Sequence, residues 1–132
     1  MEMSTPYAFG KTVATPFAAT EQKVREELQK EGFGILSEID VTAKFREKLG
    51  KEFRNYIILG ACNPALAWEA FGRELNIGTL LPCNVVVYGA DDGSTAVMIM
   101  DPVAALSLIG NPEVTGLAGM VKEKLVRVLA QL

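Results

Sequence analysis

The segment YIILGACNPAL, residues 56–66, joins a strand-like run directly to a helix start. The residues from Tyr56 to Leu59 are aromatic, β-branched or aliphatic, which suits a buried pleated surface. Asn63 is a favourable N-cap, and Pro64 follows at the first helical position, where its missing N–H costs nothing. The segment therefore predicts a strand that ends near Cys62 and a helix that begins after Asn63.

Similar signals divide the rest of the chain. Thr15-Pro16, Asp101-Pro102 and Asn111-Pro112 also place proline directly after a capping residue, which favours a helix start. Helical spacing of apolar residues predicts helices over 17–31, 41–49, 64–76, 103–109 and 113–130. Apolar runs predict strands over 7–13, 33–39, 56–62, 82–88 and 95–100.

The predicted order, β-α-β-β-α-β-β-α with short helices between, indicates an α+β fold. We expect a mostly antiparallel sheet of about five strands, with two or three long helices packed on one face. A small doubly wound parallel sheet is the competing architecture. The turn signal at residues 91–94, which predicts a hairpin over 85–100, argues against it, as does the lack of a glycine-rich phosphate loop. We expect a single domain over residues 1–132, with a loose tail at 1–6.

Composition excludes several classes of function. The chain has 132 residues, a net charge of −3 and no histidine. Without histidine, one chain cannot build a Ser-His-Asp or Cys-His mechanism. No basic cluster indicates nucleic acid, no apolar run is long enough for a bilayer, and the N-terminus does not resemble a signal peptide. We therefore expect a cytoplasmic protein that binds neither nucleic acid nor membrane and needs no cofactor. The composition does not indicate which class of reaction, if any, the protein catalyses.

Cys62 and Cys83 are the chemically distinctive residues. Cys62 is predicted just outside a helix N-terminus, where the partial positive charge favours a lowered thiol pKa. The alternative is that it is a small buried apolar residue. The helix after Cys62 carries the chain about 18 Å away, and residues 76–82 span up to roughly 23 Å if extended. Cys83 can thus return beside Cys62, but a parallel crossover would place the two thiols at opposite edges.

Several of these motifs together resemble the domain-of-unknown-function family DUF302. The matching elements are Gly60-Ala61-Cys62-Asn63-Pro64, Ala67-Trp68, residues 77–88, Asp101-Pro102 and residues 32–41. The resemblance covers the chain from about residue 17 to its end. It implies a small α+β fold with an antiparallel sheet, and it implies dimers. It supplies no established activity, and it makes Cys62, Asn63, Cys83 and Asn84 the natural site candidates.

These observations support several functions. The leading hypothesis is a homodimeric module with a small-ligand or thiol-based site at Cys62 and Cys83, in which the thiols cycle through a disulfide or hold a soft metal. Two cysteines are few for a structural metal, so no metal site is predicted from one chain. The alternative is a non-catalytic structural or protein-interaction module, with both cysteines in the core.

Two further sites deserve mention as weaker alternatives. Asp40 and Asp101 are candidate carboxylates for hydrolysis, but both are better explained as helix N-caps. The helix starts at Asn63-Pro64 and Asp101-Pro102 would form an anion site if they converge. The carboxylate of Asp101 would repel an anion there.

Overall fold

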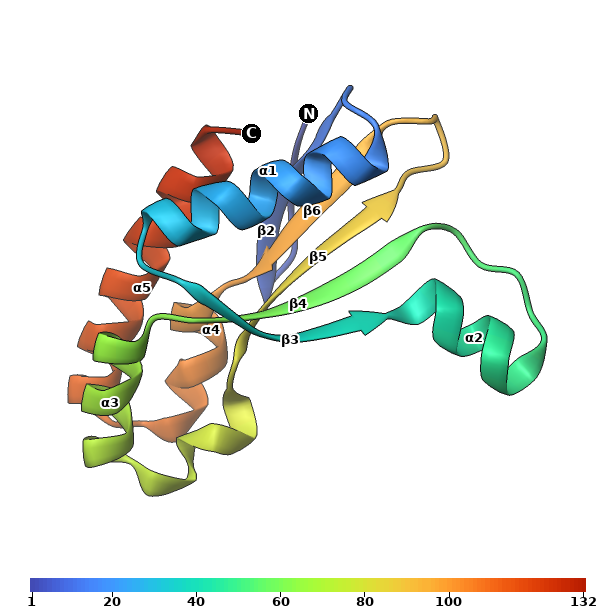
Figure 1. The fold of residues 1–132 in the computed structure, drawn as a ribbon. Coiled ribbons are helices and arrows are strands. Elements are labelled where there is room, and N and C mark those ends of the chain that lie inside the picture. Colours follow the sequence, from blue (N-terminus) through green and yellow to red (C-terminus); the bar gives the residue numbers. More distant parts are fainter.

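The computed structural model describes residues 1–132, and its centre is one antiparallel sheet (Figure 1). The strands lie in the order β1-β2-β6-β5-β4-β3, and every neighbouring pair is antiparallel. The strands are β1 (Glu2–Ser4), β2 (Ala8–Val13), β3 (Gly34–Asp40), β4 (Tyr56–Cys62), β5 (Cys83–Gly89) and β6 (Thr95–Met100). The helices are α1 (Phe17–Lys30), α2 (Val41–Leu49), α3 (Pro64–Arg73), α4 (Pro102–Leu106) and α5 (Pro112–Ala130), with short 3-10 helices η1 (Leu75–Leu80) and η2 (Ser107–Ile109).

Helices α1 and α5 cover one face of the sheet, where the main core lies. On β4 and β5, alternate residues point toward these helices, and Leu59 lies opposite Val85 in the register. Both side chains are fully buried with Leu28 of α1 and Leu125 of α5 in one cluster. An ion pair of 2.7 Å between Arg25 and Glu38 also ties α1 to β3 on this face. Burial of this apolar surface is the main contribution to the stability of the fold.

A second, smaller core lies at the end of the sheet. It joins Ala70 of α3, Ile77 of η1, Leu106 of α4, and Val114 and Ala118 of α5. The α3–η1 segment therefore folds back against the C-terminal helices, as the green and yellow-green ribbon in Figure 1 shows. Between this cluster and the strand ends lies the candidate site.

The opposite face of the sheet carries no helix, and we call it the open face. One row of paired positions crosses all six strands of it: Met3, Gly10, Met98, Val86, Ile58 and Ile39. The alternation of side chains also places here Ala8, Thr12, Ser37, Tyr56, Gly60, Asn84, Tyr88, Ala96 and Met100. None of these residues is charged, although a solvated sheet face normally alternates polar residues outward.

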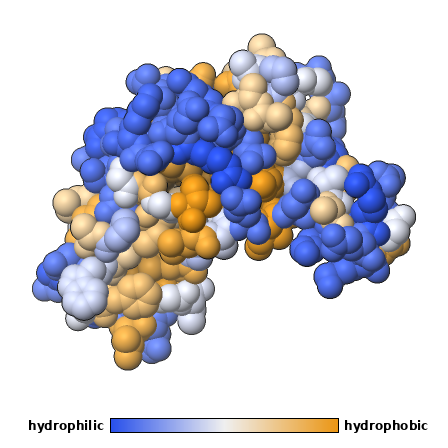
Figure 2. Space-filling view, in the orientation of Figure 1, coloured by the Kyte–Doolittle hydropathy of each residue, from blue (hydrophilic) through white to orange (hydrophobic).

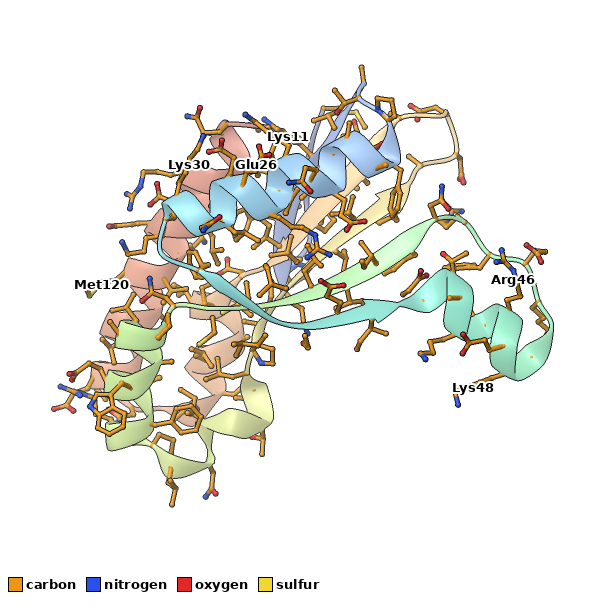
Figure 3. All side chains as sticks on the ribbon, in the orientation of Figure 1. Lys11, Glu26, Lys30, Arg46, Lys48 and Met120 are labelled. Carbon is orange, nitrogen blue, oxygen red and sulfur yellow. The ribbon has the colours of Figure 1, made fainter.

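Helix α2 projects from the sheet as an arm (Figure 1). None of its residues is buried, and its packing partner is the first part of β4. Its Lys48 extends outward, as Lys30 and Glu26 do on α1, whereas Arg46 faces the segment that returns to β4 and forms an ion pair of 3.3 Å with Glu52 (Figure 3). The aromatic rings of Phe45 and Phe53 form an edge-to-face pair with centroids 5.2 Å apart and remain partly exposed.

The predicted α+β class, with a mostly antiparallel sheet and long helices on one face, is confirmed. The sheet has six strands because residues 2–4 pair with β2, so the expected loose tail over 1–6 is wrong. Backbone hydrogen bonds to the edge of β2 order a segment whose side chains gave no strand signal. The helix expected over 64–76 ends at Arg73 and continues as η1, whereas the bounds of α2 agree with the prediction.

Candidate functional site

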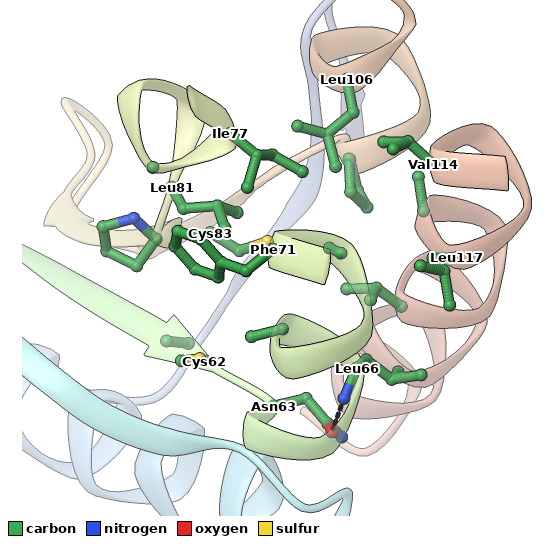
Figure 4. A pocket seen from close by; sticks show the side chains of 18 of the residues that line it. Cys62, Asn63, Leu66, Phe71, Ile77, Leu81, Cys83, Leu106, Val114 and Leu117 are labelled. Atoms are coloured by element: carbon green, nitrogen blue, oxygen red, sulfur yellow. Dashed lines mark hydrogen bonds between the residues drawn. The ribbon is translucent and has the colours of Figure 1, made fainter. Parts of the chain in front are cut away.

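An apolar pocket of about 250 Å³ lies where β4 ends and β5 begins. Helices α3, α4 and α5, segment η1 and the end of the sheet enclose it. Figure 4 shows Ile77, Leu81 and Phe71 on one side and Leu106, Val114 and Leu117 on the other. The remaining lining residues are Phe33, Leu36, Ala61, Cys62, Asn63, Leu66, Ala67, Ala70, Gly78, Pro82, Cys83, Pro102, Ala118 and Val121.

The pocket is hollow because several of its walls carry small side chains. Ala61 comes from β4, Ala67 and Ala70 from α3, and Ala118 from α5. Each of these side chains ends at Cβ, so none of them fills the space between the facing elements. Space without partner atoms forfeits dispersion contacts, which makes a hollow of this size unusual in a packed interior.

No aspartate, glutamate, lysine or arginine lines the pocket. The polar side chains of the lining are Asn63 and the weakly polar thiols of Cys62 and Cys83. Figure 2 shows the same character outside, where hydrophobic residues gather over α3 and η1 while α1 is hydrophilic. Leu36 and Phe71 border the pocket and are exposed by 66% and 40%, so the apolar lining reaches the surface.

Cys62 is half-buried in this wall, and its environment differs from the prediction. Burial raises the pKa of its thiol above the ordinary value. The predicted lowering by the helix start at Asn63 is therefore wrong. The apolar lining removes water from the thiolate, and this desolvation is the cause of the raised pKa.

Cys83 is buried on the neighbouring strand. Burial raises the pKa of its thiol to about 11, and electrostatic repulsion between the ionised forms of Cys62 and Cys83 adds to the effect. In the register, Cys83 lies opposite Ala61, not opposite Cys62. Because successive residues of a strand point to opposite faces, the two thiols leave the sheet on different sides.

Both cysteines are therefore free, and the predicted cysteine pair is wrong. Since the pocket lies beyond the ends of β4 and β5, both residues nevertheless line it. The fold brings them to one cavity without bringing them to each other.

Asn63 caps helix α3, as the sequence predicts, because its side chain accepts a hydrogen bond of 3.3 Å from the N–H of Leu66. Its amide nitrogen donates a long hydrogen bond of 3.5 Å to the carbonyl of Glu31. Asn84 does not join this site. It lies opposite Gly60 on the open face and does not line the pocket.

The two candidate carboxylates act as helix caps. Asp40 accepts a hydrogen bond of 2.9 Å from the N–H of Ala43. Asp101 accepts from the N–H groups of Val103 and Ala104, and it forms an ion pair of 2.7 Å with Lys122. Because its carboxylate occupies the start of α4, it would repel an anion there.

No group of three or more histidine, cysteine, aspartate and glutamate residues is placed to hold a metal ion. None of the helices combines the length and apolarity that crossing a bilayer requires.

Sequence reasoning missed most of the pocket wall. The apolar spacing over 113–130 predicts a helix but no cavity, and four of the wall residues lie on that helix: Val114, Leu117, Ala118 and Val121. The available signal was the alanine spacing at positions 67 and 70, which puts two small residues on one helical face. A helix face with small side chains opposite a helix with an apolar face indicates an unfilled space between them. Only the tertiary packing shows that no other side chain fills this space.

The fold and the site define the class of this protein: a small α+β module with a half-covered antiparallel sheet and an apolar pocket at its end. The family model for the domain of unknown function DUF302 matches residues 9–132, and the chain belongs to this family. The fold is also similar to the crystal structure of an uncharacterized conserved DUF302 protein from Bacillus stearothermophilus. That chain is 30% identical, the match covers 94% of this chain and 96% of that one, and the TM-score is 0.87. No curated protein matches the chain.

Proposed function

We propose that this protein is a homodimeric module that binds a small molecule in the apolar pocket. The observation that carries the proposal is the hollow itself, because a pocket lined by apolar residues with a few polar groups is the usual form of a small-molecule site. The access past Leu36 and Phe71 supports it, since a ligand can enter without unfolding the core.

The thiol-based forms of this hypothesis have less support. A nucleophilic or redox-active cysteine needs an accessible thiolate, and burial disfavours the thiolate of both Cys62 and Cys83. We assign the two thiols to the pocket wall, where they contact the ligand as soft, weakly polar groups. A reducing compartment such as the cytoplasm suits free thiols.

Titration with propylbenzene tests the ligand site. We expect saturable binding, followed by shifts of backbone amide resonances of pocket residues. Ala67→Phe places a ring in the pocket and should weaken binding at least tenfold. Ala65→Phe is the matched control, because Ala65 is exposed on the same helix and does not line the pocket. Absence of saturable binding to the wild-type protein, or equal loss in both variants, would contradict the proposal.

The open face supports the homodimer. Its central row is apolar and none of its residues is charged, so contact with water over its whole area is unfavourable. A second copy offers the same uncharged surface in a symmetric arrangement, which is the commonest geometry of dimers.

The area of the open face is small for an interface, which favours a partner subunit that also covers the arm formed by helix α2. The open face has a projected area of roughly 500 Å². This value follows from the six strands, which are about 4.8 Å apart, and from their lengths at about 3.3 Å per residue. A standard interface buries about 800 Å² on each partner. The exposed side chains of Phe45, Leu49 and Phe53 beside the sheet extend the apolar area toward this value.

Sedimentation equilibrium tests the dimer. The wild-type protein should have twice the chain mass of 14.3 kDa. Val86→Glu introduces a charge at the centre of the open face and should give the monomer mass. Val126→Glu makes the same change on the exposed side of α5 and should leave the dimer intact. A monomeric wild-type protein would remove the homodimer from the proposal and leave the ligand site unaffected.

The alternative function is a structural or interaction module without a ligand. The buried position of Cys83 in the pocket wall favours it. A stable dimer that binds no small apolar molecule would support this alternative.

A further inference from the structure

We infer that the ligand of the pocket is an uncharged, hydrocarbon-rich molecule of about ten heavy atoms, with a single hydrogen-bond acceptor directed at Asn63. This inference rests on the proposed ligand site and specifies the chemical class that the site accepts.

The residues that line the pocket determine the charge of the ligand that it accepts. No cationic or anionic side chain faces the pocket, and the thiols of Cys62 and Cys83 are held neutral by burial. A carboxylate or phosphate in this space would lose its water without gaining a counter-charge, and an ammonium group would meet the same difficulty. Burying an unpaired charge is far more costly than burying a neutral group.

The volume of the pocket determines the size of the ligand. An engineered cavity of about 150 Å³ takes up benzene. In proportion, the 250 Å³ of this pocket corresponds to about ten heavy atoms. Sugars and nucleotides are excluded as whole ligands because they are larger and present many hydroxyl or phosphate groups that the lining does not satisfy.

Asn63 sets the orientation. Its side-chain oxygen is already engaged by the N–H of Leu66. Its nitrogen has two N–H groups, and the structure gives it a single acceptor, the carbonyl of Glu31 at 3.5 Å. The structure gives the other N–H no acceptor, and we assign it to a carbonyl or ester oxygen of the ligand, because Asn63 lines the pocket at the end where α3 begins (Figure 4).

Three related probes separate these features: propylbenzene, methyl benzoate and benzoate, each titrated near neutral pH. All three have a similar size, but propylbenzene lacks an acceptor and benzoate is an anion. We expect methyl benzoate to bind about three- to tenfold more tightly than propylbenzene, which is the range that one hydrogen bond supplies. Benzoate should bind at least thirtyfold more weakly than methyl benzoate.

Variants of Asn63 test the acceptor. Asn63→Ser and Asn63→Asp both retain a good N-cap, so helix α3 is preserved. Both remove the amide N–H, and the preference for methyl benzoate over propylbenzene should then disappear. Asn63→Asp should in addition weaken any residual benzoate binding. Circular dichroism of each variant checks that the fold is retained.

The outcomes distinguish this inference from the proposed function. If propylbenzene binds and benzoate binds as tightly as methyl benzoate, the neutral ligand class is wrong while the ligand site stands. If both neutral probes bind equally in the wild-type protein, the role of Asn63 is wrong. If no probe binds, the proposed ligand site and the inference both fail.

Discussion

Cys62 ends strand β4 at the wall of an apolar pocket, and two effects act on its thiol in opposite directions. The N-terminus of α3 stabilises a thiolate, whereas the loss of water around the sulfur destabilises it. The pKa of the Cys62 thiol is raised, and the cause is burial. The position of a cysteine relative to a helix therefore does not establish its reactivity unless its solvation is known.

Alkylation by iodoacetamide near pH 8 should reveal this environment. Because the pKa of Cys83 is raised from 9.0 to about 11, its thiolate population and labelling rate should fall about 100-fold, and burial should slow it further. Cys62 should label faster than Cys83 but more slowly than a free thiol, and both rates should rise with pH. Mass spectrometry of Cys62→Ser and Cys83→Ser assigns each rate. Rapid labelling of Cys62 at neutral pH would contradict the raised pKa.

At Asp101, hydrogen bonds and charge have a larger effect on the pKa than burial has. Burial tends to raise the pKa of its carboxyl group, but the hydrogen bond from Lys122 and those from the backbone N–H groups of Ala104 and Val103 outweigh burial, and the pKa is lowered. A carboxyl group with a lowered folded-state pKa stabilises the protein above its unfolded-state pKa. That stabilisation is lost as the pH falls through the folded-state pKa.

Asp101→Asn should therefore weaken the pH dependence of stability below about pH 4. Asparagine preserves the cap of α4, so the change isolates the charge. At neutral pH we expect a loss of about 1 kcal/mol, a modest value because Lys122 is partly exposed. Urea denaturation across this pH range measures both effects. If the free energy of unfolding changed with pH below pH 4 equally in the variant and the wild-type protein, the ion pair between Asp101 and Lys122 would not contribute to stability.

At the scale of elements, α2 is the least supported helix. It is nine residues long, has no buried residue and lies outside both core clusters. An isolated helix of this length is marginal in water because nucleation is unfavourable. Its Asp40 cap and its C-terminal Gly50, which has a positive φ of 64°, define its ends but do not bury it.

Hydrogen exchange should show what stabilises α2. In the Val86→Glu variant, which we expect to be monomeric, the amides of α2 should exchange at least tenfold faster than in the wild-type protein, which we propose to be a dimer. The amides of α5 around Leu125 should change little, since that helix packs in the main core. Equal exchange of α2 in both proteins would show that the partner does not cover the arm.

At the scale of the whole molecule, two core clusters share helix α5. Leu125 and Val128 belong to the main core, whereas Val114 and Ala118 belong to the smaller core at the pocket. A continuous helix transmits the loss of either cluster to the other. We therefore expect the chain to unfold as one cooperative unit.

Two substitutions test this cooperativity. Leu125→Ala should reduce the free energy of unfolding by about 3–4 kcal/mol. Ile77→Ala should cost less, about 2 kcal/mol, because Ile77 already faces the pocket and loses fewer contacts. Both variants should show a single shifted transition in urea, by fluorescence of Trp68 and by circular dichroism alike. Two separate transitions in either variant would indicate that the pocket region folds independently.

The features determined by the sequence alone are those that depend on neighbouring residues. The caps at Asn63, Asp101 and Asn111, each followed by proline, begin helices where expected, because capping involves groups only two or three residues apart. The apolar runs of β4, β5 and β6 likewise predict a sheet with buried central strands. Local hydrogen bonding and periodicity are sufficient for both.

Tertiary structure alone decided the strand β1, the register of Cys83 against Ala61 and the hollow beside them. The register depends on how two strands align across the sheet, and one residue of difference moves a side chain to the other face. The hollow depends on four alanines from three elements that meet at one place. Such properties arise from distances between segments far apart in the chain, and no local pattern of residues encodes those distances.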